Sequence, residues 1–237
     1  MPNSTRDAEL GAVFVRLADN FVSGADIIDL LTTLVEESKH LLNIDEVGLL
    51  LLDAAGDLQV AATTSEETRL VEILHLSGKA GPGLHAFQTR TVFSVDDVQS
   101  HATLWATFAE AALEHGFRGV HAVPLRLRDD TIGVMNLFSR KAQSLNAPDA
   151  AVGQSFADIA TISIIGQRNL TLEQVVRGHI QEALNTRVVI EQAKGIISEA
   201  RGLSMKDSFD YLRRYSRDNN IKLNDVARKV VDRAIRL

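Results

Sequence analysis

Proline is absent from the chain after residue 148, and this absence constrains the fold more than any other feature of the sequence. The four prolines are Pro2, Pro82, Pro124 and Pro148. Because a proline inside a helix removes a hydrogen bond and clashes with the preceding turn, a long proline-free stretch is compatible with helix. Residues 148–201 are interrupted only by glycines, and as one helix they would be about 80 Å long at roughly 1.5 Å per residue. A helix of that length needs a partner.

A weak heptad pattern runs through the middle of this stretch. Two sets of residues repeat at intervals of seven: Ile162, Asn169, Val176 and Ala183, and at the offset positions Ile165, Leu172 and His179. Polar residues in such a seam fix the register of paired helices at a cost in stability. Two interpretations stay open. One is a coiled coil that makes the protein a homodimer, and the other is a terminal domain helix followed by an ordinary linker.

Before residue 148 the hydrophobic pattern changes period several times. Helical spacing predicts helices at 8–21, 26–42, 66–76, 83–89 and 103–115, and β-prone runs predict strands at 47–53, 58–64, 91–95, 119–127 and 132–138. Segments 54–57 and 128–131 are typical of hairpin turns. Hairpins and helices mixed without a regular βαβ alternation predict an α+β domain, an antiparallel sheet with flanking helices.

The C-terminal residues predict three helices joined by two turns. Gly202 ends the first helix, and Ser204 to Asp207 resembles a capping box at the start of the second. Residues 218–220 form the next turn. We therefore expect three parts: a domain at 1–165, a helical linker at 166–176 and a small helical domain at 177–237.

The net charge of −6 is the sum of two opposed parts. Residues 1–165 hold 11 basic and 22 acidic residues, whereas residues 166–237 hold 14 basic and 9 acidic ones. A small basic helical module is a plausible binder of phosphates. The alternative is that these lysines and arginines only solvate helix surfaces, as they usually do.

The chain has no cysteine. This excludes disulfides, thiolate zinc sites and a cysteine nucleophile. The N-terminal residues 1–9 are polar and lack the apolar core of a signal peptide, and the longest apolar run, 47–52, is too short to cross a membrane. We therefore expect a cytoplasmic protein without a membrane partner.

Residues 185–197, read as NTRVVIEQAKGII, resemble the signature of the ANTAR domain, an RNA-binding antitermination module. Phe209, Leu212 and Arg213 resemble the pattern of its second helix, and the run from Leu223 to Ala227 resembles the opening of its third. The resemblance covers 175–237. One departure is Ser198, where an apolar residue is usual.

Residues 8–165 resemble a GAF domain, a PAS-like sensory fold. The segments that carry this resemblance are 81–86 (GPGLHA), 122–125 (AVPL) and 132–138 (IGVMNLF). Together the two resemblances imply a GAF–ANTAR transcription antitermination regulator of the actinobacterial type, with a long helix joining its two domains. Some relatives have cysteine where this chain has Gly83, so the resemblance gives no support for thiol-based sensing here.

The ANTAR resemblance implies binding to paired hairpins in nascent mRNA, which prevents the overlapping terminator from forming. Cations neutralise phosphates, and hairpin loops expose unstacked bases. The candidate RNA-binding residues are Arg187, Lys194, Gly195, Arg213, Arg214, Tyr215, Arg217, Asn219 and Lys229.

Three of these candidates keep a structural alternative. Arg187 either contacts RNA or braces the helices through a carboxylate. Gly195 allows close approach of either a helix or RNA. Tyr215 either stacks on a loop base or belongs to the core.

Two hairpins suggest two ANTAR modules and hence a homodimer. GAF domains bind small molecules of many kinds, and the sequence names neither a ligand nor a cofactor here. Histidines 75, 85, 101, 115 and 121 lack metal-ligand spacing. We expect no catalysis, because the one GAF branch known to reduce methionine sulfoxide needs cysteines. The alternatives are a DNA-binding helix-turn-helix regulator and a pure dimerisation module.

Overall fold

The computed structural model describes residues 9–17, 27–53, 55–127, 130–143, 145–165, 172–219 and 221–235, without the side chains of 127, 130, 165 and 172–185. The heptad residues from Ile165 to Ala183 lie outside the described side chains, so the coiled coil stays a prediction. Of that pattern only Ile162 is described, and its side chain is 63% exposed. No helix in the described ranges is long and apolar enough to span a membrane.

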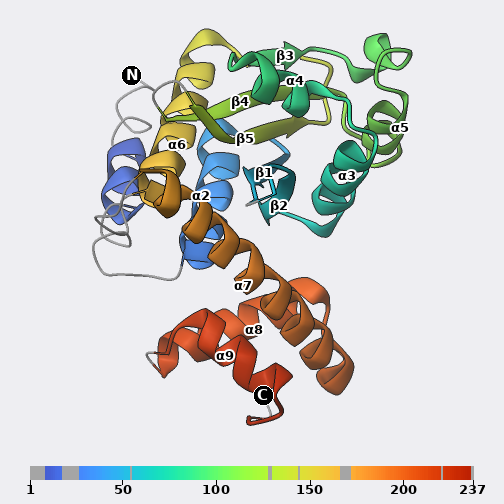
Figure 1. Ribbon diagram of the computed structural model, residues 1–237. Helices are drawn as coiled ribbons and strands as arrows, with labels where there is room; N and C mark the ends of the chain where they lie inside the picture. Colours follow the sequence, from blue (N-terminus) through green and yellow to red (C-terminus); the bar gives the residue numbers. More distant parts are fainter. Residues whose placement is uncertain are drawn as a thin grey trace.

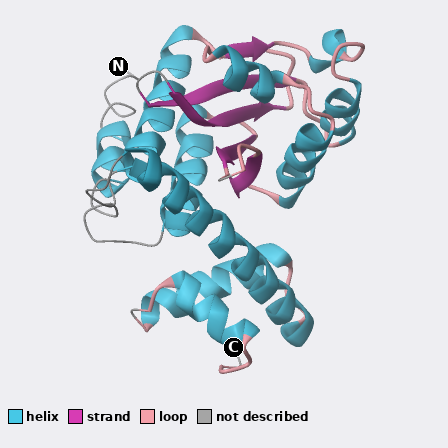
Figure 2. Ribbon diagram, in the orientation of Figure 1, coloured by secondary structure: helices cyan, strands magenta, loops and turns pink. Residues whose placement is uncertain are grey.

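Five antiparallel strands form one sheet (Figure 2). They are β1 (Glu46–Leu52), β2 (Leu58–Thr63), β3 (Phe93–Val95), β4 (Gly119–Leu127) and β5 (Asp130–Ser139). The order across the sheet is β2-β1-β5-β4-β3, and every pair of neighbours is antiparallel. Two hairpins, β1–β2 and β4–β5, therefore lie side by side. The predicted antiparallel sheet is confirmed.

Helices cover both faces of the sheet (Figure 1). On one side α2 (Ile27–Leu42) and α6 (Ala147–Ile165) share a buried cluster with Val123, Met135 and Leu137 of the central strands. On the other side lie α3 (Glu66–Ser77), α4 (Pro82–Thr89) and α5 (Ala106–Glu114), packed against the intervening residues such as Ala122 and Phe138. The alternation of side chains along each strand thus gives the sheet two cores. We call residues 27–165 the sheet domain.

One helix begins later than its sequence pattern predicts. The expected helix 103–115 starts at Ala106, because residues 98–101 form the short 3-10 helix η1 (Val98–His101), whose first turn is capped by Asp97. The predicted end is confirmed, since Gly116 follows with φ of +80°. A positive φ suits glycine, which has no Cβ to clash.

Three helices form the tail, which we define as residues 172–235. They are α7 (Leu172–Arg201), α8 (Met205–Asp218) and α9 (Leu223–Val231). Ile190 and Ile197 of α7 pack with Leu212 of α8 and with Val226 and Val230 of α9, all of them buried. Figure 1 shows α7 leaving the sheet domain with α8 and α9 at its far end.

The predicted signals between the tail helices are confirmed. Gly202 ends α7 with φ of +67°. The Ser204 hydroxyl accepts a hydrogen bond from the Asp207 backbone N–H at 3.0 Å, which caps α8 as the sequence pattern predicts. Ser198 has a use that the sequence did not indicate, because its hydroxyl donates to the Leu203 carbonyl at 2.7 Å.

Candidate nucleic-acid interface

Three charged side chains of α7 share one face of the helix. Arg187, Glu191 and Lys194 are spaced by four and three residues, which places them on one side of an α-helix. Lys194 Nζ donates to both carboxylate oxygens of Glu191, at 3.0 and 3.2 Å. Arg187 Nε lies 3.0 Å from Glu191 Oε1, close enough for an ion pair although its angle does not make a hydrogen bond. Glu191 therefore sits between two cations.

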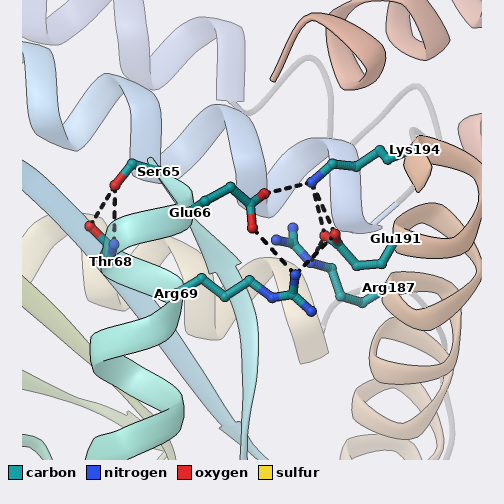
Figure 3. A network of polar contacts seen from close by, with 7 residues as sticks. All are labelled: Ser65, Glu66, Thr68, Arg69, Arg187, Glu191 and Lys194. Atoms are coloured by element: carbon teal, nitrogen blue, oxygen red, sulfur yellow. Dashed lines mark hydrogen bonds and ion pairs between the residues drawn. The ribbon is translucent and has the colours of Figure 1, made fainter. Parts of the chain in front are cut away.

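Two residues of α3 complete this network from the sheet domain (Figure 3). Lys194 Nζ donates to Glu66 Oε1 at 2.8 Å. Arg69 Nη1 lies 3.1 Å from Glu191 Oε2 and 3.4 Å from Glu66 Oε2. Burial raises the pKa of the Glu66 carboxyl, but the hydrogen bond and charge of Lys194, followed by those of Arg69, outweigh it, so that the net pKa is lowered. The network thus joins the tail to the sheet domain.

Arg187 is a buried cation of the network, with 9% of its surface exposed. Burial lowers the pKa of its guanidinium, and Arg69 lowers it further, whereas Glu191 and Glu66 raise it. An arginine keeps its charge under such conditions. Its position supports the bracing interpretation over a contact with RNA.

Arg213 of α8 makes a second junction with the sheet domain. Its Nε donates to Asp29 Oδ1 at 2.7 Å, and its Nη2 donates to Thr33 Oγ1 at 3.1 Å. Its Nη1 donates to Glu36 Oε2 at 3.3 Å. The three partners lie on one face of α2, because they are four and three residues apart. All three nitrogens of the guanidinium therefore have a partner.

Phe209 connects the two junctions. Lys194 Nζ lies 5.8 Å and Arg213 Cζ 5.9 Å from the centre of its ring. Both distances allow a cation–π attraction. Lys194, Phe209 and Arg213 thus form one continuous face, which we call the clamped face.

The other predicted residues lie away from these junctions. Arg214, Arg217 and Lys229 are exposed, and none of them pairs with a carboxylate in the described part of the chain. Gly195 is exposed and a Cβ built there meets nothing within 4 Å, so no helix in the described part of the chain requires a glycine at that position. The predicted residues therefore fall into an exposed set and a set held by carboxylates.

Tyr215 and Asn219 contact each other at the end of α8. Tyr215 is partly buried and packs against the apolar cluster. Asn219 is exposed, and its side-chain Nδ2 donates to the Tyr215 carbonyl at 2.9 Å. This contact leaves the Asn219 side chain at the surface of the tail.

Sequence reasoning missed the acidic partners Asp29, Glu36, Glu66 and Glu191. For Glu191 a signal existed, since its spacing from Arg187 and Lys194 places all three on one helix face. For Asp29, Glu36 and Glu66 none existed, because they lie more than a hundred residues before their partners.

A polar cluster is buried within the sheet domain between β5 and α3. Glu72, His75 and Asn136 are each at most 1% exposed. Asn136 Nδ2 donates to both oxygens of Glu72, and His75 Nδ1 lies 3.1 Å from Glu72 Oε2. The Leu84 backbone N–H donates to His75 Nε2 at 3.4 Å. In these contacts His75 Nε2 accepts from the backbone, while Nδ1 faces the Glu72 carboxylate.

The GAF-like segments surround this cluster. Residues 81–86 form the start of α4, and 122–125 and 132–138 lie on β4 and β5. A Cβ at Gly83 would lie 2.7 Å from the amide atoms of Asn136. Glycine at this position therefore lets α4 approach the strand closely. Within the described residues no group of three potential metal-ligating side chains is found.

Two family models match the chain. The ANTAR domain model matches residues 178–231, and the GAF domain model matches residues 24–164. These matches define a regulatory protein in which a sensing domain precedes an RNA-binding antitermination module. The chain belongs to the GAF family and carries an ANTAR domain in its C-terminal part.

Solved structures agree with the fold of the sheet domain. The GAF domain of a phosphoenolpyruvate-protein phosphotransferase from Coxiella burnetii is similar with a TM-score of 0.54 and 15% identity, over 66% of this chain and 93% of that one. The GAF domain from the corresponding Acinetobacter protein gives 0.51 and 12%, over 67% and 96%. Free methionine-R-sulfoxide reductase from Neisseria meningitidis gives 0.51 and 19%, over 69% and 90%. A search of curated proteins found no match.

Proposed function

We propose that this protein binds paired hairpins in nascent mRNA through its tail and thereby prevents a terminator from forming, under control of its sheet domain. The observation that carries the proposal is the exposed set of cations in a tail that matches the ANTAR domain: Arg214, Arg217 and Lys229. Exposed cations without carboxylate partners are available to RNA phosphates. Arg228 and Arg233 are also exposed and add positive charge beside them.

The recognition of two hairpins by one assembly calls for two tails. We propose that the protein acts as a homodimer, with the segment from α6 into α7 as its dimer contact. The heptad pattern supports this assignment, as does the 63% exposure of Ile162. Light scattering of the full chain tests it, since a monomer both with and without RNA would contradict it.

We propose a regulatory rather than a catalytic role for this protein. We further propose that it acts in the cytoplasm. Methionine sulfoxide reduction by a GAF domain depends on cysteine chemistry, and this chain has no cysteine. The sheet domain would instead sense a small molecule or a partner.

A competition experiment tests RNA binding. The full chain is offered a library of RNAs, each with two adjacent hairpins and randomised loops, together with duplex DNA of equal length at the same salt concentration. The account predicts enrichment of hairpin RNA, and preference for the duplex would favour the helix-turn-helix alternative.

A triple variant, Arg214→Ala/Arg217→Ala/Lys229→Ala, tests the exposed set. We expect affinity for the enriched RNA to fall about tenfold or more and the salt slope to become shallower, because fewer counterions are released. The matched control is Lys79→Ala/Arg126→Ala/Lys141→Ala, which removes three exposed cations from the sheet domain. Unchanged affinity in the first variant would show that these three cations do not bind the RNA, and no enrichment of any nucleic acid by the wild type would favour a pure dimerisation module.

A further inference from the structure

We propose that the sheet domain masks part of the RNA-binding surface of the tail. In the conformation seen here, acidic side chains of α2 and α3 hold Lys194 and Arg213 where RNA phosphates would otherwise bind. RNA and the sheet domain therefore compete for the clamped face. This inference rests on the proposed function and names its regulation.

The chemistry of the clamped face fits an RNA loop. Two cations flank one aromatic ring, with Lys194 and Arg213 both within 6 Å of the centre of Phe209. Proteins bind unpaired nucleotides with such a combination, because bases stack on aromatic rings while cations neutralise the backbone. The clamped face thus resembles a surface that binds an RNA loop, and carboxylates of the sheet domain lie on it in this conformation.

Partners within the protein already engage both cations. The side chain of Lys194 is 5% exposed and that of Arg213 is 14% exposed. Arg213 donates through all three of its nitrogens to Asp29, Thr33 and Glu36. Three of the five N–H donors of the guanidinium are then engaged, so fewer are available for the bidentate grip on a phosphate that arginine normally provides.

The contacts between the sheet domain and the clamped face are suited to being reversible. Its acidic partners stay at the rim, since the side chains of Asp29, Glu36 and Glu66 are 32%, 51% and 42% exposed. Ion pairs with such exposure contribute little individually, because water and salt screen them. An RNA that brings many phosphates to one face can therefore displace three scattered carboxylates.

Apolar packing continues across the same junction. The buried residues of the tail belong to one contiguous cluster with those of α2 and α6. The tail thus packs on the sheet domain through apolar residues, and the charged contacts lie at the same junction. A signal that moves both α2 and α3 away from the tail would release Arg213 and leave Lys194 paired with Glu191 of its own helix.

The energetic consequence is a lowered apparent affinity for RNA. When only a fraction of the molecules has an open face, the apparent dissociation constant is raised by the inverse of that fraction. Neutralising the carboxylates removes this penalty and leaves the cations in place. We expect RNA to bind the neutralised protein about tenfold more tightly or better, by the same relation.

The test uses the full chain with Asp29→Asn/Glu36→Gln/Glu66→Gln. The matched control is Glu67→Gln/Glu110→Gln/Glu114→Gln, which changes the net charge equally at exposed carboxylates that make no ion pair with the tail in the described ranges. The probe is the hairpin RNA enriched from the library. Each protein also carries spin labels at Gln88→Cys and Gln192→Cys, two exposed sites on α4 and α7 in a chain without native cysteine.

The two readouts separate the inference from the proposed function. Two results support the masking of the clamped face. The first variant alone binds RNA more tightly and shows a longer, broader distance between the two spin labels. The wild type shows a similar lengthening of this distance when RNA is added. Equal RNA affinity in all three proteins overturns the inference and leaves RNA binding intact. Absence of RNA binding in all three proteins contradicts the proposed function and overturns the inference with it, whatever the label distance shows.

Discussion

Asn136 and Glu72 meet in the interior of the sheet domain, where the amide Nδ2 donates to both carboxylate oxygens at 2.8 and 3.1 Å. Both side chains are at most 1% exposed. A buried carboxylate is stable only when hydrogen-bonded partners replace water, and His75 supplies the other contact. This relationship fixes α3 against β5, and α3 also carries Glu66 and Arg69 to the tail.

Removal of this carboxylate is expected to destabilise the domain strongly. Glu72→Ala leaves the Asn136 amide and His75 Nδ1 without their carboxylate partner, at a cost of about 3 kcal/mol in the free energy of unfolding. Glu67→Ala on the same helix is the control and should change it by less than about 0.5 kcal/mol. Urea denaturation measures both, and an equal effect of the two changes would refute a structural role for the cluster.

Gly48 makes room for the same carboxylate, because a Cβ at residue 48 would overlap Glu72 Oε1. Gly48→Ala should therefore cost about 2 kcal/mol by overpacking. In the double variant with Glu72→Ala this clash is absent. The double variant should therefore lose less unfolding free energy than the sum of the losses of the two single variants. Strict additivity would show that the glycine serves another purpose.

His121 makes stability depend on pH. It is 6% exposed, Ser94 Oγ contacts its Nδ1, and its Nε2 has no partner in the described structure. Burial lowers the pKa of this imidazole. Because the folded form then binds a proton less readily than the unfolded one, stability is full above the ordinary histidine range and falls as pH drops below about 6.5.

The measurement for His121 compares unfolding free energies at pH 7.5 and 5.5. We expect His121→Gln to lose less stability over this interval than the wild type does. His85→Gln, at an exposed histidine, should follow the wild type. A His121 variant whose stability keeps the full pH dependence would show that other groups cause it.

Ser198 should stabilise the end of α7 despite its departure from the family pattern. Its hydroxyl donates to the Leu203 carbonyl, and the loss of such a bond costs about 1 kcal/mol. Ser198→Ala should lower the unfolding free energy by this amount, whereas Gln192→Ala at an exposed site of the same helix should not. Thermal denaturation of both variants measures these changes. An unchanged stability of Ser198→Ala would show that this hydrogen bond does not stabilise the helix end.

Arg187 distinguishes a brace from an RNA contact. Arg187→Gln leaves Glu191 with Lys194 and Arg69 only, and we expect a loss of about 1–2 kcal/mol, less than for an isolated buried pair. Affinity for hairpin RNA should stay within about twofold of the wild type, because a buried guanidinium reaches few phosphates. Weaker RNA binding at unchanged stability would assign Arg187 to the interface instead.

The sequence predicted most of the fold because hydrophobic period and turn residues are local signals. The bounds of β4 match the prediction, and the cap at Ser204 and the stop at Gly202 follow from their own chemistry. Helix α5 starts later than predicted because Asp97 caps a short 3-10 helix just before it, which the apolar spacing alone does not reveal.

The candidate site was only partly predictable. The cations Lys194 and Arg213 stand out in the sequence, but their acidic partners lie on α2 and α3 and come close only through the tertiary fold. The inner cluster was equally hidden, since the contact between Glu72 and Asn136 crosses 64 positions. Pairings of this kind depend on packing between elements, about which local patterns carry no information.

The most direct test of the central claim is sequencing of RNA crosslinked to this protein in cells. The account predicts reads concentrated on pairs of small hairpins that overlap terminators, and loss of these reads in the Arg214→Ala/Arg217→Ala/Lys229→Ala variant. Reads scattered without such structures, or an unchanged profile in that variant, would contradict RNA antitermination as the function of this protein.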